Sequence, residues 1–296
     1  MNTACFDIGG TFIKYGIMSS DGKLSSQGKM ETPVEQAPEQ IPSVIASKVA
    51  EFKQELAIDH IGISSCGLVD HQSGKIIFSS NIPNYSGLPL AEEVSKRTGL
   101  PVKIENDVRC AGLGEMAYGA GRGKQDVVLL TLVTGIGGAI INDGKLIRGN
   151  GNLAGELGHM TIVHNGEPCP CGNVGCFERY ASTSALTRFY EQITGEKIGG
   201  KAIMDRKQKS EPAANDAYDT FISYLVTGLV NIAHLYNPEV IIIGGGITAQ
   251  GQKFLDDIEQ AYKQKVMKVY KDSTKLVLAE LENDAALYGA ASLFQK

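Results

Sequence analysis

Three short apolar segments of this chain each run directly into a cluster of glycines. Residues 4–8, 127–133 and 240–243 lead into glycines at positions 9–10, 135–138 and 244–246. Short apolar runs followed by glycine predict buried strands that end in sharp turns. The chain has 35 glycines among 296 residues, well above the usual share of about 7%. They occur singly or in small clusters, which indicates turns and close backbone approach rather than low complexity.

Helical and strand patterns alternate between these turns. Apolar residues recur at helical spacing over residues 39–56 and again over residues 216–236. This alternation predicts an α/β protein with a central sheet. The other expected elements are strands at 60–64, 102–105 and 275–279 and helices near 90–98, up to about 269, and at 284–294.

The two halves of the chain resemble each other weakly. DIGGTFIKYGIMSSDGKL begins at residue 7, and TGIGGAIINDGKL begins at residue 134. Both place a glycine pair between apolar strands and then close a turn with Asp-Gly-Lys-Leu. The pattern predicts two related modules, although repetition of common turn residues by chance gives the same pattern.

Charge and hydropathy exclude several classes of protein. With 28 basic and 33 acidic side chains, the net charge of −5 argues against a broadly basic nucleic-acid binder. No secretory signal opens the sequence, and no apolar run reaches the ~18 residues of a membrane span. We therefore expect a cytoplasmic protein with no membrane partner. In a reducing compartment, its six cysteines favour a metal site or plain burial over disulfides.

The densest motif is a cysteine cluster. Cys169, Cys171 and Cys176 lie within eight residues, and intervening glycines allow the chain to fold back. Three thiolates can bind one Zn²⁺, which needs a fourth ligand. His159 is close enough in sequence to supply it, and His164 is a rival. Four protein ligands would make this zinc structural rather than catalytic.

The glycine turns are candidate phosphate sites. Backbone amides of such turns can approach phosphate oxygens, Thr11 adds a hydroxyl, and Asp7 is placed to hold a Mg²⁺-bound water. Because no Gly-x-x-x-x-Gly-Lys-Ser/Thr sequence occurs, a Walker-type loop is excluded. Three such turns favour a nucleotide ligand. They comprise Gly9, Gly10 and Thr11; Thr134, Gly135, Gly137 and Gly138; and Gly244, Gly245 and Gly246.

A dinucleotide fold is the rival interpretation. Residues 244–249 fit Gly-x-Gly-x-x-Ala between a predicted strand and helix, and Glu280 ends the next strand. Too little chain follows this motif for the rest of such a domain, so an NAD-dependent oxidoreductase is the weaker hypothesis.

Carboxylates supply candidate catalytic groups. Asp107, in Glu105-Asn106-Asp107, follows a strand and begins a helix. An acid there can be only a helix cap, but beside a glycine-lined cleft it can also serve as a general base. Glu156 and Glu178 flank the metal segment. Hydroxyl-rich neutral ligands need such acceptors, so a sugar fits.

Taken together, these motifs resemble the ROK family (repressors, open reading frames, kinases) over nearly the whole chain. The likeness rests on Asp-Ile-Gly-Gly-Thr with Lys14, on Glu-Asn-Asp-Val, and on the glycine turns. It also includes Gly-Glu-Leu-Gly-His at 155–159 and the Cys-x-Cys-Gly-x-x-Gly-Cys-x-Glu motif at 169–178. Where many relatives have glycine at both ends of the second turn, this chain has Val133 and Ala139. That difference leaves only the phosphate geometry of the turn in question.

The resemblance implies two actin-like (ribonuclease-H-like) domains with a nucleotide- and sugar-binding cleft between them. Residues 1–118, rejoined by a C-terminal helix at 284–296, would form the first domain, and residues 119–283 the second, with the zinc site. Asp107 would be the catalytic base, and the glycine turns with Asp7 and Lys14 would bind ATP. The sugar would contact Asn81, Asn106, Asp107, Glu156, His159 and Glu178, and the zinc would be bound by His159, Cys169, Cys171 and Cys176.

The function that follows is an ATP-dependent hexose kinase acting on the 6-hydroxyl, with ATP, Mg²⁺ and structural Zn²⁺. Glucose is the first choice of substrate. N-acetylmannosamine or another N-acetylhexosamine, fructose and a β-glucoside are the alternatives. The family also contains DNA-binding repressors and suggests a homodimer. The first strand begins within four residues of Met1, which leaves no room for a preceding DNA-binding module. A sugar sensor without catalysis is a further alternative, disfavoured by the intact Asp107.

Overall fold

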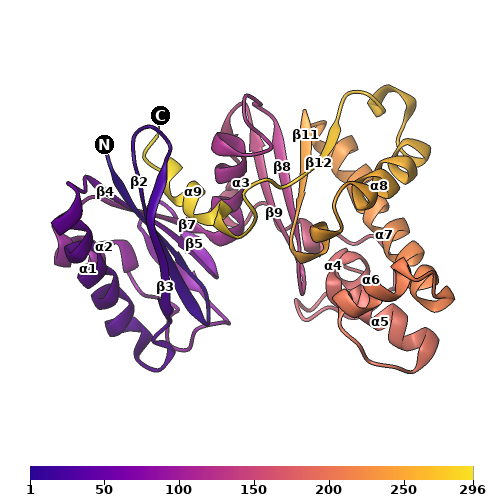
Figure 1. Cartoon of the computed structure of the whole chain (residues 1–296), viewed down its shortest axis with the longest axis horizontal. Helices are drawn as coiled ribbons and strands as arrows, with labels where there is room; N and C mark the ends of the chain where they lie inside the picture. The colour runs from indigo at the N-terminus through magenta and orange to yellow at the C-terminus, as the bar shows by residue number, and fades with distance from the viewer. Residues whose placement is uncertain (296) are drawn as a thin grey trace. The chain divides into compact units, whose positions relative to one another are not determined.

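The computed structural model describes residues 1–295 and shows an α/β protein (Figure 1). The chain divides into two compact units. The first contains Met1–Gly123, Leu146–Ala154 and the described residues from Asn283 onward, and the second contains Lys124–Lys145 and Gly155–Glu282. The boundaries expected from the sequence differ from this division at residues 119–123, 146–154 and 283, which they place in the second domain. Hydrogen bonds and an ion pair to the first unit, described below, hold residues 146–154.

The first unit is built on a five-stranded mixed sheet in the order β3-β2-β1-β4-β7. β1 pairs antiparallel with β2 and parallel with β4, which in turn pairs parallel with β7. A small second sheet joins β5 and β6. The strands are β1 (Thr3–Ile8), β2 (Phe12–Met18), β3 (Leu24–Glu31), β4 (His60–Ser65), β5 (Leu68–Asp70), β6 (Lys75–Phe78) and β7 (Val102–Asn106).

The second unit repeats this plan. Its sheet has the order β10-β9-β8-β11-β12, with β9 antiparallel to β8 and both β11 and β12 parallel to their neighbours. In both sheets a hairpin flanks the first strand on one side and parallel strands flank it on the other, as the internal repeat predicted. The strands are β8 (Val127–Leu132), β9 (Ile136–Asn142), β10 (Lys145–Leu146), β11 (Val240–Gly244) and β12 (Lys275–Leu278).

The expected helices are present, with shifted ends. α7 begins at Pro212, where proline suits the first helical turn. α8 ends at Lys265 because Val266 is extended, so it is shorter than the periodicity predicted. α5 and α6 are helices for which no element was predicted from the sequence. The helices are α1 (Ala37–Glu55), α2 (Leu90–Thr98), α3 (Asp107–Tyr118), α4 (Glu178–Ala181), α5 (Thr183–Thr194), α6 (Gly200–Gln208), α7 (Pro212–Tyr236), α8 (Gln252–Lys265) and α9 (Ala285–Ser292).

Helices cover both faces of the first sheet. Alternate residues of β1 face opposite sides, so Phe6 joins the core beneath α1 and α2 while Cys5 joins the core beneath α3 and α9. Apolar packing of both faces explains why β1 reads as a nearly continuous apolar run. Among the described residues, no helix has the length and hydropathy that crossing a membrane requires.

α9 packs unusually closely on α3 and β4 (Figure 1, yellow helix). A β-carbon on Gly289 would lie 1.7 Å from the carbonyl oxygen of Cys110 in α3, and one on Gly62 would lie 2.0 Å from that of Ala290. Gly114 of α3 meets Ala285 in the same way, at 2.1 Å. The C-terminal helix can dock here only because these positions have no side chain.

We therefore expect Gly289→Ala to lower the free energy of unfolding by about 1–3 kcal/mol, because the methyl group must push two backbones apart. Gly199→Ala is the matched control, since nothing lies within 4 Å of a β-carbon there. Urea unfolding followed by circular dichroism measures both. Equal stability of the Gly289→Ala variant and the wild type would contradict this account of the packing.

Candidate functional site

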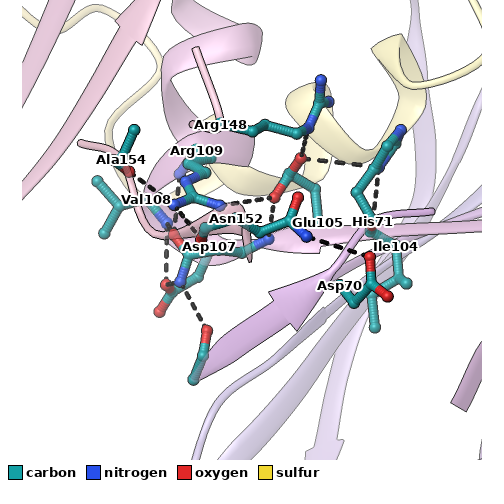
Figure 2. Close-up of polar contacts among 12 residues, drawn as sticks. Asp70, His71, Ile104, Glu105, Asp107, Val108, Arg109, Arg148, Asn152 and Ala154 are labelled. Carbon is teal, nitrogen blue, oxygen red and sulfur yellow. Dashed lines mark hydrogen bonds and ion pairs between the residues drawn. The ribbon is translucent and has the colours of Figure 1, made fainter. Parts of the chain in front are cut away.

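Asp107 lies where β7 ends and α3 begins. The side-chain oxygen of Asn106 accepts the backbone N–H groups of Val108 at 3.0 Å and Arg109 at 3.2 Å, which caps the helix. The amide nitrogen of Asn106 donates to Asp107 Oδ1 at 2.8 Å and to the Gly67 carbonyl at 3.0 Å. Asp107 Oδ1 also accepts the backbone N–H of Val108 at 2.9 Å (Figure 2). Within residues 1–295, the hydrogen bonds to Asp107 thus go to Oδ1, which leaves Oδ2 for a reacting group.

Asp107 has the electrostatics of a general base. Its pKa is raised from 3.8 to about 6, mainly by burial and in smaller part by the negative charge of Asp7. The hydrogen bonds from Val108 and Asn106 oppose this shift without cancelling it. A carboxylate with a pKa close to neutral pH can both accept and release a proton in catalysis.

Asp7 and Asp107 lie at the same edge of the first sheet. β1, β4 and β7 run parallel, so their carboxyl ends meet at that edge. Asp7 accepts a hydrogen bond from the Ser64 hydroxyl at 2.7 Å and lies 3.8 Å from Lys14 Nζ. Burial raises the pKa of Asp7, while Ser64 and Lys14 lower it. Lys14 Nζ also donates to the Asn283 carbonyl at 2.6 Å, so β2 is tied to the segment that leads into α9.

The first glycine turn brings Asn81 to this edge. A β-carbon on Gly10 would lie 3.2 Å from the Asn81 carbonyl oxygen, so the two backbones are close neighbours. The Gly9 N–H is bonded to the Phe12 carbonyl at 3.0 Å, while Thr11 is exposed. The structure thus gathers Asp7, Asn81 and Asp107, three of the candidate site residues, at one edge of the first unit.

The other two glycine turns lie together at one edge of the second sheet, where the parallel strands β8 and β11 end. Several of their glycines are explained by packing. A β-carbon on Gly138 would lie 2.5 Å from the Gly155 carbonyl oxygen, and one on Gly245 would lie 2.1 Å from that of Leu132. Gly246 has open space around it. Glycine content alone therefore overstates the number of phosphate contacts here.

Four side chains of the second unit form a cluster with the donor set of a metal site. The ligand atoms of His159, Cys169, Cys171 and Cys176 all lie within 4.8 Å of one another. His164, the rival predicted from sequence, is not part of it. The loop folds back through Gly175 at φ +74°, where a β-carbon would lie 1.8 Å from the Val163 carbonyl oxygen.

The spacing of these ligands fits zinc. The Cys171 and Cys176 sulfurs are 3.6 Å apart, and the Cys169 sulfur is 3.7 Å from His159 Nδ1. Tetrahedral zinc with Zn–S bonds of about 2.3 Å requires separations of about 3.8 Å between neighbouring ligand atoms. Burial raises the pKa of the Cys169 thiol to about 12, and the Asn173 N–H lowers that of Cys171. Binding of a cation would displace the remaining thiol protons, because cysteine binds metal as the thiolate.

Glu156 and Glu178 flank this cluster in space as well as in sequence. Glu156 begins the 3₁₀ turn that carries His159, with its carbonyl accepting the His159 N–H at 3.0 Å. Glu178 Oε1 accepts the Cys169 thiol at 3.1 Å and lies 3.8 Å from His159 Nδ1. Because Nδ1 faces the cluster, the other ring nitrogen of His159, Nε2, is left for another partner.

Sequence reasoning missed a buried ion cluster beside Asp107. Glu105 is completely buried and accepts a hydrogen bond from Arg148 Nε at 2.7 Å (Figure 2). Arg109 Nη1 and His71 Nδ1 lie 3.6 and 3.7 Å from its carboxylate. An acid at the end of a predicted strand is a visible signal, but nothing in the spacing points to Arg148.

Comparisons with known proteins agree with these features. A family model described as ROK family matches residues 3–296. The glucokinase of Thermotoga maritima is 34% identical, over 98% of this chain and 96% of that protein. The β-glucoside kinase of Listeria innocua is 33% identical, over 99% and 97%. A crystal structure of a ROK family glucokinase from Streptomyces griseus, in complex with glucose and AMPPNP, superposes with a TM-score of 0.81 at 34% identity, covering 99% of both chains.

The pKa of Asp107 predicts a pH-dependent effect of Asp107→Asn on stability. A folded-state pKa of about 6 against 3.8 means that ionisation costs the folded state roughly 2–3 kcal/mol at neutral pH. Wild-type stability therefore falls as pH rises through this window, and the asparagine variant lacks that loss.

We expect the variant to gain stability over the wild type between about pH 4 and pH 6, with a constant difference at higher pH. Urea unfolding across this range measures it, with exposed Asp205→Asn in α6 as the control. A difference independent of pH would mean that burial does not raise the pKa of Asp107.

Proposed function

The chain belongs to the ROK family, and from this premise we propose that it is an ATP-dependent kinase that phosphorylates the 6-hydroxyl of a hexose, with glucose as the preferred substrate. Its fold is the two-domain actin-like fold of ROK sugar kinases, as the sequence predicted. The relative from Streptomyces griseus binds both glucose and an ATP analogue. The observation that carries the proposal is Asp107, a carboxylate with one free oxygen and a pKa of about 6 at a sheet edge.

In the proposed reaction, Asp107 accepts the proton of the sugar 6-hydroxyl as that oxygen attacks the γ-phosphorus of ATP. The bond from the γ-phosphorus to the bridging oxygen breaks, and ADP leaves. Asn106 orients Asp107 through the 2.8 Å hydrogen bond to Oδ1. Such a reaction depends mostly on positioning and on neutralising phosphate charge.

Phosphate binding is assigned to the glycine turns together with Thr11, Thr134 and Lys14. The open space around Gly246 suits close approach of a phosphate. Asp7 would hold a water molecule bound to Mg²⁺, an ion that prefers oxygen ligands. When present, Mg²⁺ would offset negative charge on the phosphates.

Sugar binding is assigned to the six residues that the family motifs indicate. Carboxylates and amides accept and donate hydrogen bonds to hydroxyls, and His159 offers the ring nitrogen that faces away from the metal cluster. Zinc at the cluster would act as a brace for the neighbouring carboxylates rather than at the phosphorus. The six residues are Asn81, Asn106, Asp107, Glu156, His159 and Glu178.

The choice of hexose among the alternatives is an experimental question. An N-acetylhexosamine, fructose or a β-glucoside would differ from glucose at carbon 1 or carbon 2. A coupled ADP-release assay over about 20 sugars separates these substrates, and no release with any sugar would favour a non-catalytic sensor. The weaker oxidoreductase hypothesis loses support, because residues 246–250 form a 3₁₀ turn rather than the first turn of α8. The homodimer and the cytoplasmic location stay predictions.

Asp107→Asn tests the assignment of the base. We expect kcat to fall by about 10²–10⁴-fold, the usual contribution of a general base, while glucose affinity measured by calorimetry changes little. In the wild type, kcat/KM is expected to fall below about pH 6 as Asp107 becomes protonated. Asp205→Asn is again the control. More than about a tenth of the wild-type rate in the Asp107 variant would exclude Asp107 as the base.

Cys171→Ser tests the role of the metal. We expect the variant to lose zinc and to bind glucose much more weakly, with a smaller change for a non-hydrolysable ATP analogue. The reason is that Glu178 contacts the cluster directly through Oε1. Of the turn at residues 134–138, Gly135 lies near Glu178, with its β-carbon position 2.5 Å from Oε2, so a smaller effect on the ATP analogue is expected. Metal analysis and calorimetry measure these effects. Cys5→Ala, which removes a buried thiol outside the cluster, controls for general destabilisation. A folded, zinc-free variant with wild-type glucose affinity would refute the brace.

A further inference from the structure

Glu105 is a wholly buried carboxylate surrounded by cationic groups. Its side chain has 0% exposure. Oε2 accepts the 2.7 Å hydrogen bond from Arg148 Nε, and Oε1 lies 3.6 Å from Arg109 Nη1. The Arg109 side chain is only 4% exposed, and its Nη1 atom has no hydrogen-bond partner within residues 1–295. Glu105 therefore supplies the charge that balances a second buried ion.

The two arginines connect Glu105 to a segment that is distant in sequence, residues 146–154. Residues 146–154 follow the hairpin strands of the second unit, belong to the first unit, and lead directly into Gly155-Glu156. Arg148 lies within this segment. Arg109 Nη2 donates to the carbonyls of Asn152 at 2.8 Å and Ala154 at 2.6 Å (Figure 2). Ala154 in turn donates its N–H to the Arg148 carbonyl at 2.9 Å.

The Glu105 carboxylate is also connected to the candidate base, Asp107, through Asn106. Glu105 Oε1 accepts the backbone N–H of Asn106 at 2.9 Å. Asn106 then caps α3 and holds Asp107 Oδ1. One buried side chain thus orients both the strand end that carries Asp107 and the segment that ends two residues before Glu156.

We propose that Glu105 is a positioning residue that sets the Asp107 carboxylate and the 146–154 segment in one arrangement. The catalytic part of this inference rests on the proposed hexose kinase function. Glutamine at this position keeps an oxygen for the Asn106 N–H but places an NH₂ group against the Arg148 Nε–H, so two donors face each other. It also leaves the two guanidinium charges uncompensated. Both the base and the segment then lose their fixed geometry.

Glu105→Gln provides the kinetic test. We expect kcat to fall about 10- to 100-fold, as small misplacements of reacting groups do, and the KM for glucose to rise while the KM for ATP stays the same. Arg148→Gln removes the same ion pair from the other side, at the residue that belongs to the 146–154 segment. Because the Arg148 side chain is partly exposed, this substitution is less liable to prevent folding. If the two residues act through one contact, the double variant loses no more activity than Glu105→Gln alone.

Glu115→Gln is the matched control. Glu115 is also wholly buried, lies in α3, the helix that Asp107 begins, and accepts the N–H of Ala120, just after that helix, at 2.9 Å. We expect this variant to lose stability while keeping kcat within about two-fold of the wild type. An equal loss of kcat in both variants would mean that burial alone, not positioning, explains the effect.

Hydrogen exchange measured by mass spectrometry separates this inference from the function on which it rests. Glu105→Gln is expected to accelerate amide exchange in peptides covering residues 106–109 and 146–154, whereas Glu115→Gln leaves the second peptide unchanged. Unchanged exchange there, or a wild-type kcat and glucose KM in Glu105→Gln, overturns the positioning role even if the wild type phosphorylates glucose. Absence of ADP release with any hexose overturns the proposed function and the catalytic part of the role, while accelerated exchange would still show the structural coupling.

Discussion

The buried carboxylate of Glu105 constrains how the chain is arranged in the first unit of this protein. Arg148 and Arg109 lie beside the Glu105 carboxylate, and both connect it to residues 146–154. Arg148 belongs to that segment, and Arg109 donates to its backbone. Each partner therefore fixes the others, as in other buried ion clusters, where removing one member costs more than the contact contributes. The cluster also orients the strand end that leads into Asp107, because Glu105 accepts the backbone N–H of Asn106.

Features encoded by nearby residues could be predicted from the sequence. The strand–glycine turns, the strand–helix junction at Asp107 and the cysteine cluster all depend on residues close together in the chain, and the structure has them in the expected elements. Spacing alone leaves His164 as a rival, and the family resemblance selects His159, which is the histidine in the cluster. The turn at Glu156–His159 and the fold-back at Gly175 together explain its position.

Features that depend on long-range contacts were missed. The return of residues 146–154 to the first unit depends on Glu105, more than 40 positions earlier, and no spacing rule links an acid to an arginine at that distance. The glycine turns were over-interpreted for a related reason. Gly138 and Gly245 lack a side chain because the backbones of Gly155 and Leu132 approach them, which a single sequence cannot distinguish from approach by a phosphate.

The close docking of α9 also bears on how the molecule is made. The first unit is assembled from three separate stretches of sequence, and its closing helix starts at Ala285. During synthesis, a ribosome must therefore complete the whole second unit before the face of β1 and β4 that receives α9 can be covered. Until then, Cys110 and the neighbouring apolar surface would face solvent in the nascent chain. The second unit can fold first although it is encoded later.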